Sequence, residues 1–209
     1  FGSIVVTTNL LAWTITVHMV IAIVILALVI YDSIYSFVVP VEYPKVGEPP
    51  SSVRLGVVAA TGGATTWMNI PGAPDKNYLP RMEWNKNEAL IVQRLNRKQN
   101  ESKLFNCDIK SGATQLIYQE SDNAWIDIKS RWNDDDPRGW EWIDNGNAFL
   151  WVSEKDGWRH VYKISRDGKK ETLLTNGAYD IETISAIDEK NNMLYFIASP
   201  DNPVQRYLY

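Results

Sequence analysis

The stretch Trp142 to Thr175 reads WIDNGNAFLWVSEKDGWRHVYKISRDGKKETLLT, and a similar stretch, WNKNEALIVQRLNRKQNESKLFNCDIKSGATQLIY, runs from Trp84 to Tyr118. Each has an aromatic start, a polar turn, a hydrophobic strand, a polar hairpin, a second strand, a Gly-containing turn and a last strand. A third unit starts near Ile187 and runs to Tyr209. Strands that recur in this way are typical of propeller blades, four-stranded sheets that bury their faces against neighbouring sheets around an axis.

The turns between these strands carry residues suited to hairpins. Asp144-Asn145-Gly146 and Asp167-Gly168 tolerate the positive φ of tight turns, and Ser111-Gly112 holds the matching place in the earlier unit. An ordinary β-sandwich is the alternative, but the aligned strands favour a propeller. The sequence therefore predicts an all-β fold, a partial β-propeller of about three blades. The last blade is expected to be incomplete, because Tyr209 lies inside a strand.

The first 31 residues differ from the rest of the chain. No Asp, Glu, Lys or Arg precedes Asp32, and the run from Ile4 to Tyr31 is almost entirely apolar. About 20 such residues suffice for a helix to cross a bilayer. We therefore expect one transmembrane α-helix in a domain of residues 1–31 and the propeller fragment in a domain of residues 32–209. A signal peptide and a buried core helix are the alternatives.

Charge and cysteine content exclude several classes of function. The formal net charge is -4 and the basic residues are scattered, which argues against a nucleic-acid partner. The single cysteine, Cys107, excludes an internal disulfide and a cysteine metal cluster. Its apolar neighbours predict a buried structural thiol.

Four motifs, in order, resemble the β-propeller of the dipeptidyl peptidase IV family. They are the Tyr-Pro-Lys-x-Gly connection at Tyr43, the blade around LPRMEWNKNEALIVQRLNRKQNESK, the Asp-Gly-Trp-Arg-His hairpin at Asp156, and the TNGAYDIETI step at Thr175. The resemblance covers residues 32–209. It implies a serine peptidase that releases dipeptides after a penultimate Pro or Ala, with a Ser-Asp-His triad on an α/β-hydrolase domain. The propeller then gates access and holds the amino terminus of the substrate.

The resemblance also implies what this chain lacks. The family's paired-glutamate motif is expected upstream of Tyr43, and no Gly-x-Ser-x-Gly occurs in the sequence. We therefore expect a non-catalytic fragment, cut off at Tyr209, whose peptide substrate is bound with the missing hydrolase domain. Full-length members often dimerise, and the expected location is membrane-anchored, through residues 4–31, with a periplasmic or extracellular propeller. The alternative is a membrane-tethered, inactive propeller that binds another protein, so the activity of the parent protein stays open.

Candidate site residues are few. The family resemblance assigns Arg131 and Trp132 to a pocket for the substrate side chain. Residues Asp134 to Asp136 point in different directions in an extended loop, so we expect a solvated loop rather than a metal site. His160, without a partner Ser or Cys motif, is expected to be a packed histidine. The four tryptophans Trp140, Trp142, Trp151 and Trp158 are assigned to blade packing.

His18 lies within the apolar run, where an ionisable residue is costly and often functional. Residues 2–31 resemble a transmembrane helix of haem A synthase, in which a histidine in this setting binds haem. The resemblance implies His18 as a haem ligand, although a lone helix cannot complete a haem site. No cofactor is otherwise expected. Because the family's anchor helix lies far upstream of Tyr43, we infer a join between two unrelated reading frames.

Overall fold

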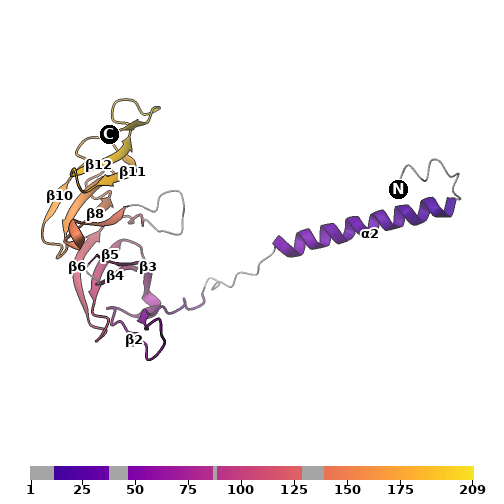
Figure 1. Cartoon of the computed structure of the whole chain (residues 1–209), viewed down its shortest axis with the longest axis horizontal. Coiled ribbons are helices and arrows are strands. Elements are labelled where there is room, and N and C mark those ends of the chain that lie inside the picture. Colours follow the sequence, from indigo (N-terminus) through magenta and orange to yellow (C-terminus); the bar gives the residue numbers. More distant parts are fainter. Residues whose placement is uncertain (1–11, 38–46, 87–88, 129–138) are drawn as a thin grey trace. The chain divides into compact units, whose positions relative to one another are not determined.

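The computed structural model describes residues 12–37, 47–86, 89–128 and 139–209 (Figure 1). Contacts divide the chain into two compact units, 1–48 and 49–209. The prediction of a domain boundary after Tyr31, with a join of reading frames there, stays a prediction.

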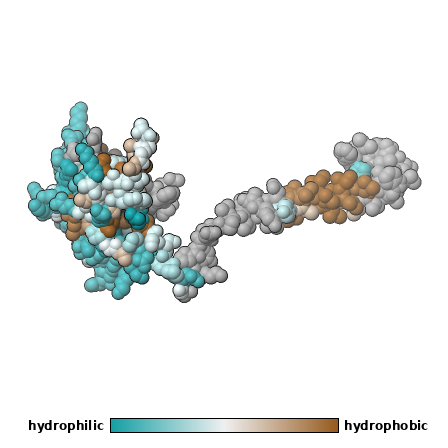
Figure 2. Space-filling view, turned by 90° about the horizontal axis from the view of Figure 1, so that it is seen from below, coloured by the Kyte–Doolittle hydropathy of each residue, from teal (hydrophilic) through white to brown (hydrophobic). Residues whose placement is uncertain are grey.

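The first unit holds one described helix, α2 (Ala12–Phe37), of 26 residues. It continues past Asp32, where the sequence had suggested an end. From Val17 to Tyr31 its side chains form a largely hydrophobic surface (Figure 2). Among the described residues, no helical segment combines the length and the apolar character that a membrane span requires. The transmembrane prediction for residues 4–31 is therefore not supported.

The second unit is built from antiparallel sheets whose strands follow chain order (Figure 1). We call the two four-stranded sheets the first and second blades. The first blade contains β3 (Asn77–Trp84), β4 (Leu90–Asn96), β5 (Glu101–Cys107) and β6 (Thr114–Ser121). The second contains β7 (Trp140–Ile143), β8 (Ala148–Ser153), β9 (His160–Ser165) and β10 (Glu171–Leu173). A two-stranded sheet of β1 (Gly56–Val57) and β2 (Thr66–Trp67) precedes them, and a three-stranded sheet of β11 (Ile181–Asp188), β12 (Met193–Ala198) and β13 (Tyr207–Leu208) follows.

This arrangement is mostly β, as predicted, and is consistent with a propeller fragment. The two hydrophobic runs at Ala89 and Ala148 became β4 and β8. Each leading tryptophan lies inside the first strand of its blade, Trp84 at the end of β3 and Trp142 within β7, so each sheet begins before the residue that opened the predicted repeat. The first sheet is small, since β1 is confined to Gly56–Val57.

The core is continuous from sheet to sheet because the central strands bury both of their faces. All six residues of β8 are buried. Phe149 and Trp151 pack toward the first blade, in a cluster with Ile91 and Leu104. Their alternate neighbours, Leu150 and Val152, pack toward the third sheet, in a cluster with Ile181 and Ile184. This is the two-residue alternation of a strand between two sheets.

Tryptophan packing was predicted correctly at three of four positions. Trp140 and Trp151 are buried, and Trp142 packs against the same cluster. Trp158, in the hairpin after β8, is 41% exposed and does not belong to these clusters. Cys107 is buried as expected, and burial raises the pKa of its thiol to about 11.

Two short glycine turns lie against the backbone of the preceding sheet. Gly168, in the β9–β10 hairpin, has φ 72°, and a Cβ there would lie 1.6 Å from the Ile117 carbonyl oxygen of β6. Gly112, in the β5–β6 hairpin, has φ 76°, and a Cβ there would lie 2.2 Å from the Trp67 carbonyl oxygen of β2. Both turns therefore need glycine for the positive φ and for the close approach to the preceding sheet.

Candidate functional site

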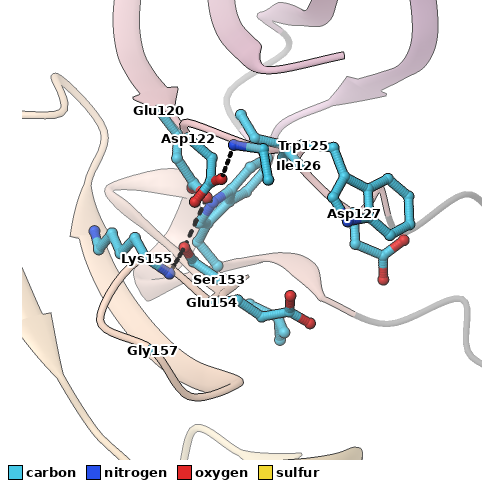
Figure 3. A pocket seen from close by; sticks show the side chains of 12 residues that line it. Glu120, Asp122, Trp125, Ile126, Asp127, Ser153, Glu154, Lys155 and Gly157 are labelled. Carbon is cyan, nitrogen blue, oxygen red and sulfur yellow. Dashed lines mark hydrogen bonds between the residues drawn. The ribbon is translucent and has the colours of Figure 1, made fainter.

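A cavity of about 240 Å³ lies between the first and second blades (Figure 3). We call it the inter-blade pocket. One wall is the end of β6 with the segment Asp122–Asp127 that follows it. The other is the end of β8 with the hairpin Ser153–Gly157.

Glu120 joins the two walls. Its Oε2 accepts a hydrogen bond from Trp151 Nε1 at 2.7 Å, and its Oε1 accepts one from Ser153 Oγ, also at 2.7 Å (Figure 3). Glu120 is on β6 of the first blade, whereas both donors are on β8 of the second. The carboxylate thus satisfies two polar groups that the core would otherwise bury without an acceptor.

The segment after β6 turns so that neighbouring side chains point in opposite directions. Asp122 Oδ1 accepts from the amide of Ala124 at 2.6 Å, a short-range turn typical of Asp. The amide of Ile126 donates to the carbonyl of Gln99 at 2.7 Å, and the Ile126 side chain is buried. Trp125, next to it, is 62% exposed and lines the pocket. A large aromatic surface is therefore accessible at the pocket.

The hairpin on the other wall is fixed by its own polar contacts. Ser153 Oγ accepts from the amide of Lys155 at 3.2 Å, and the amide of Gly157 donates to the carbonyl of Glu154 at 2.9 Å. At its end, Asp156 Oδ2 lies 2.8 Å from Nδ1 of His160, which is 1% exposed. The prediction of a packed His160 is confirmed.

Electrostatics in this hairpin favour a charged Asp156. Partial burial acts to raise the pKa of its carboxyl, but hydrogen bonds from His160, Tyr162 and the amide of Trp158 outweigh that effect. The pKa of Asp156 is therefore lowered below its ordinary value. The same contacts keep Tyr162 protonated, since burial and the hydrogen bond to Asp156 raise the pKa of its phenol.

Lys155 is the one basic residue that lines the pocket in the described part of the chain. Its Nζ pairs with Glu171 at 2.5 Å, contacts Tyr118 Oη at 3.1 Å and lies 4.0 Å from the centre of the Tyr162 ring. Burial and the charges of Glu120 and Glu171 raise the pKa of the Tyr118 phenol. The ammonium charge of Lys155 is thus compensated outside the pocket.

Among the described lining residues, the other charged side chains are all acidic. They belong to Glu120, Asp122, Asp127 and Glu154. Together with the exposed face of Trp125, they form a surface suited to a cationic, partly apolar group. Among the described residues, no group of three His, Cys, Asp or Glu side chains is placed to hold a metal ion.

The residues predicted from the sequence are not the ones that form this pocket. Arg131 and Trp132 lie outside the described residues, as do Asp134 to Asp136, although all of them follow soon after Asp127 in the chain. His18 is half-buried on α2, in the other unit. Sequence reasoning missed Glu120 and Trp125, because the contacts that matter cross from one blade to the next. The turn-forming pair Ser121-Asp122 before Trp125 is the sequence feature that could have pointed to this segment.

Comparison with known families matches residues 19–209 to the model of the dipeptidyl peptidase IV N-terminal region. The chain belongs to this family. A probable dipeptidyl peptidase 4 of Emericella nidulans is 25% identical over 174 residues, 81% of this chain and 22% of that protein. The inactive dipeptidyl peptidase 10 of Rattus norvegicus is 31% identical over 180 residues, 80% of this chain and 22% of that protein. The chain spans about a fifth of the length of these dipeptidyl peptidase relatives.

A solved structure gives the same result for the fold. The crystal structure of Porphyromonas gingivalis dipeptidyl peptidase 4 superposes with a TM-score of 0.68 at 28% identity, covering 80% of this chain and 23% of that one. The predicted family is thereby confirmed. The resemblance of residues 2–31 to haem A synthase is not confirmed, and the family match begins at Met19, inside α2.

Proposed function

We propose that residues 49–209 are a non-catalytic, substrate-positioning part of the propeller of a dipeptidyl-peptidase-IV-like serine exopeptidase. The whole protein would release dipeptides after a penultimate Pro or Ala, using a hydrolase domain to which this part presents the peptide. The observation that carries the proposal is the acidic pocket with an exposed tryptophan between two blades.

The chemistry of the pocket suits the end of a peptide. A free α-amino group has a pKa near 8 and is therefore mostly cationic at neutral pH. Asp127 and Glu154 supply negative charge at the pocket, and Trp125 offers an aromatic face for a cation or an apolar side chain. Arg131 and Trp132, which the family resemblance assigns to the side-chain pocket, follow Asp127 closely in sequence.

Calorimetric titration of the full chain tests this proposal. The ligand is a short peptide that begins with X-Pro and has a free amino terminus, and the control is the same peptide acetylated at that terminus. We expect the free peptide to bind and the acetylated one to bind at least about tenfold more weakly, the factor that corresponds to 1.4 kcal/mol. Equal affinity for the two peptides would overturn the role of the pocket.

A second function, as a protein-binding module, is favoured by the relative named inactive dipeptidyl peptidase 10, at 31% identity. The two proposals differ in whether the whole protein carries a catalytic hydrolase domain. A Gly-x-Ser-x-Gly motif with Asp and His in the coding sequence beyond Tyr209 favours the peptidase, and a hydrolase domain without the serine favours the binding module. A location outside the cytoplasm and dimer formation belong to the proposal in either case.

A further inference from the structure

We infer that Glu120 is a positioning residue: it ties the first blade to the β8–β9 hairpin and so sets the width of the inter-blade pocket. This inference deepens the proposed function, because it names the residue that controls the geometry of the site. It rests on contacts within the chain, so it can be tested without any ligand.

Both carboxylate oxygens of Glu120 are committed to the second blade. The indole of Trp151 and the hydroxyl of Ser153 donate to different oxygens, each at 2.7 Å. Trp151 is 6% exposed and Ser153 is 4% exposed. Hydrogen bonds to an ionised acceptor are stronger than neutral ones. Losing the carboxylate would leave two buried donors without this acceptor, which is the costly case for a polar pair.

Ser153 links Glu120 to the hairpin through two hydrogen bonds of its hydroxyl. Its hydroxyl donates to Glu120 and accepts from the amide of Lys155 at 3.2 Å. The next residues, Glu154 and Gly157, form the outer part of the same wall of the pocket. The Glu120 carboxylate therefore fixes the hydroxyl that begins the turn.

A second contact from the same strand supports this role. Tyr118 lies two residues before Glu120, on the same face of β6. Its Oη is 3.1 Å from Lys155 Nζ and 3.3 Å from Glu171 Oε2. β6 thus reaches the hairpin at two points, and Glu120 is the one next to the pocket.

Glu120 also belongs to the wall of the pocket that continues through Asp122. Both oxygens of its carboxylate already accept hydrogen bonds from the second blade. Changes at Glu120 should therefore act on binding through the spacing of the walls.

The test uses the full chain labelled with ¹⁵N and compares E120Q with the wild type. The Trp151 indole resonance is assigned from its loss in W151F. We expect E120Q to move the Trp151 indole proton upfield and to speed amide exchange in residues 153–157 about tenfold, the scale of one lost charge-assisted hydrogen bond. The Trp67 indole, at the far side of the first blade, should keep its position. Fluorescence with the X-Pro peptide should also show weaker binding.

Two matched variants separate positioning from general destabilisation. S153A keeps the Glu120–Trp151 bond, so its Trp151 indole resonance should stay in place while hairpin exchange speeds up. E154Q removes a pocket charge, so it should weaken peptide binding but leave both the resonance and the exchange rates unchanged. If E120Q does not fold, the amide exchange rates of residues 153–157 in S153A test the inference instead.

An unchanged Trp151 resonance in E120Q, or unchanged hairpin exchange in E120Q or S153A, would overturn the inference. If the resonance and exchange change as expected but no peptide binds, Glu120 still positions the hairpin and the proposed function fails instead.

Discussion

Asp156 shows how one side chain can make the hairpin sensitive to acid. Its folded pKa is lowered by contacts with His160, Tyr162 and the Trp158 amide. A carboxyl with a lowered folded pKa stabilises the fold above its unfolded pKa, and this contribution is lost as pH falls through the folded value. The loss should therefore occur below the ordinary Asp value of 3.8.

We predict that D156N lowers the free energy of unfolding of the full chain at pH 6, and that the difference from wild type shrinks as pH falls below about 4. Urea unfolding from pH 2 to pH 6 measures this. Y162F, which removes one donor to Asp156 but keeps the ring, should show a smaller change of the same sign. Parallel wild-type and D156N curves across the range would be evidence against the assignment.

Burial of single side chains was predicted well where local sequence alone determines it. His160 was expected to be packed because the sequence offers it no partner Ser or Cys motif, and Cys107 because apolar residues lie near it; both are buried. The exposure of Trp158 was not predicted, because a tryptophan in a hairpin can either fold back onto the sheet or face solvent. Glu120 was missed for a related reason, since its donors are 31 and 33 residues away.

At the scale of elements, the glycine turns do more than reverse the chain. The sequence predicted hairpins at Ser111-Gly112 and Asp167-Gly168, because these residues allow positive φ. It could not show that each turn touches the backbone of the preceding sheet. Turn chemistry is local, whereas docking depends on how far one blade is rotated from the next.

We predict that G168A destabilises the full chain by about 2–4 kcal/mol, since its Cβ would clash with the Ile117 carbonyl and its φ of 72° disfavours alanine. G157A is the control. Its φ is also positive, at 96°, but no atom lies within 4 Å of the added Cβ, so it should lose only about 1 kcal/mol. Urea unfolding gives both values, and equal losses would mean that the turn is not docked on β6.

The strands also differ in how well the sequence predicts them. β4 and β8 were found because their hydrophobic runs stand out. β3 was missed as a strand because its sequence, NYLPRMEW, mixes polar residues and a proline with apolar ones. Pairing with β4, rather than intrinsic propensity, makes it a strand, and this is common for β structure.

At the scale of the whole chain, the family and the all-β unit followed from repeated motifs. The first unit was harder to predict. An apolar run alone does not fix where a helix begins or ends, and α2 continues past the first charged residue, Asp32. The proposed join after Tyr31 remains to be tested by reading the source DNA across that codon.

We propose that the pocket between the two blades receives the amino-terminal end of a peptide. Hydrogen-exchange mass spectrometry of the full chain, with and without a saturating X-Pro peptide, tests it most directly. We predict that protection increases in residues 120–127 and 153–157, and that the acetylated peptide produces much less. Protection elsewhere with none in these two segments would contradict the account.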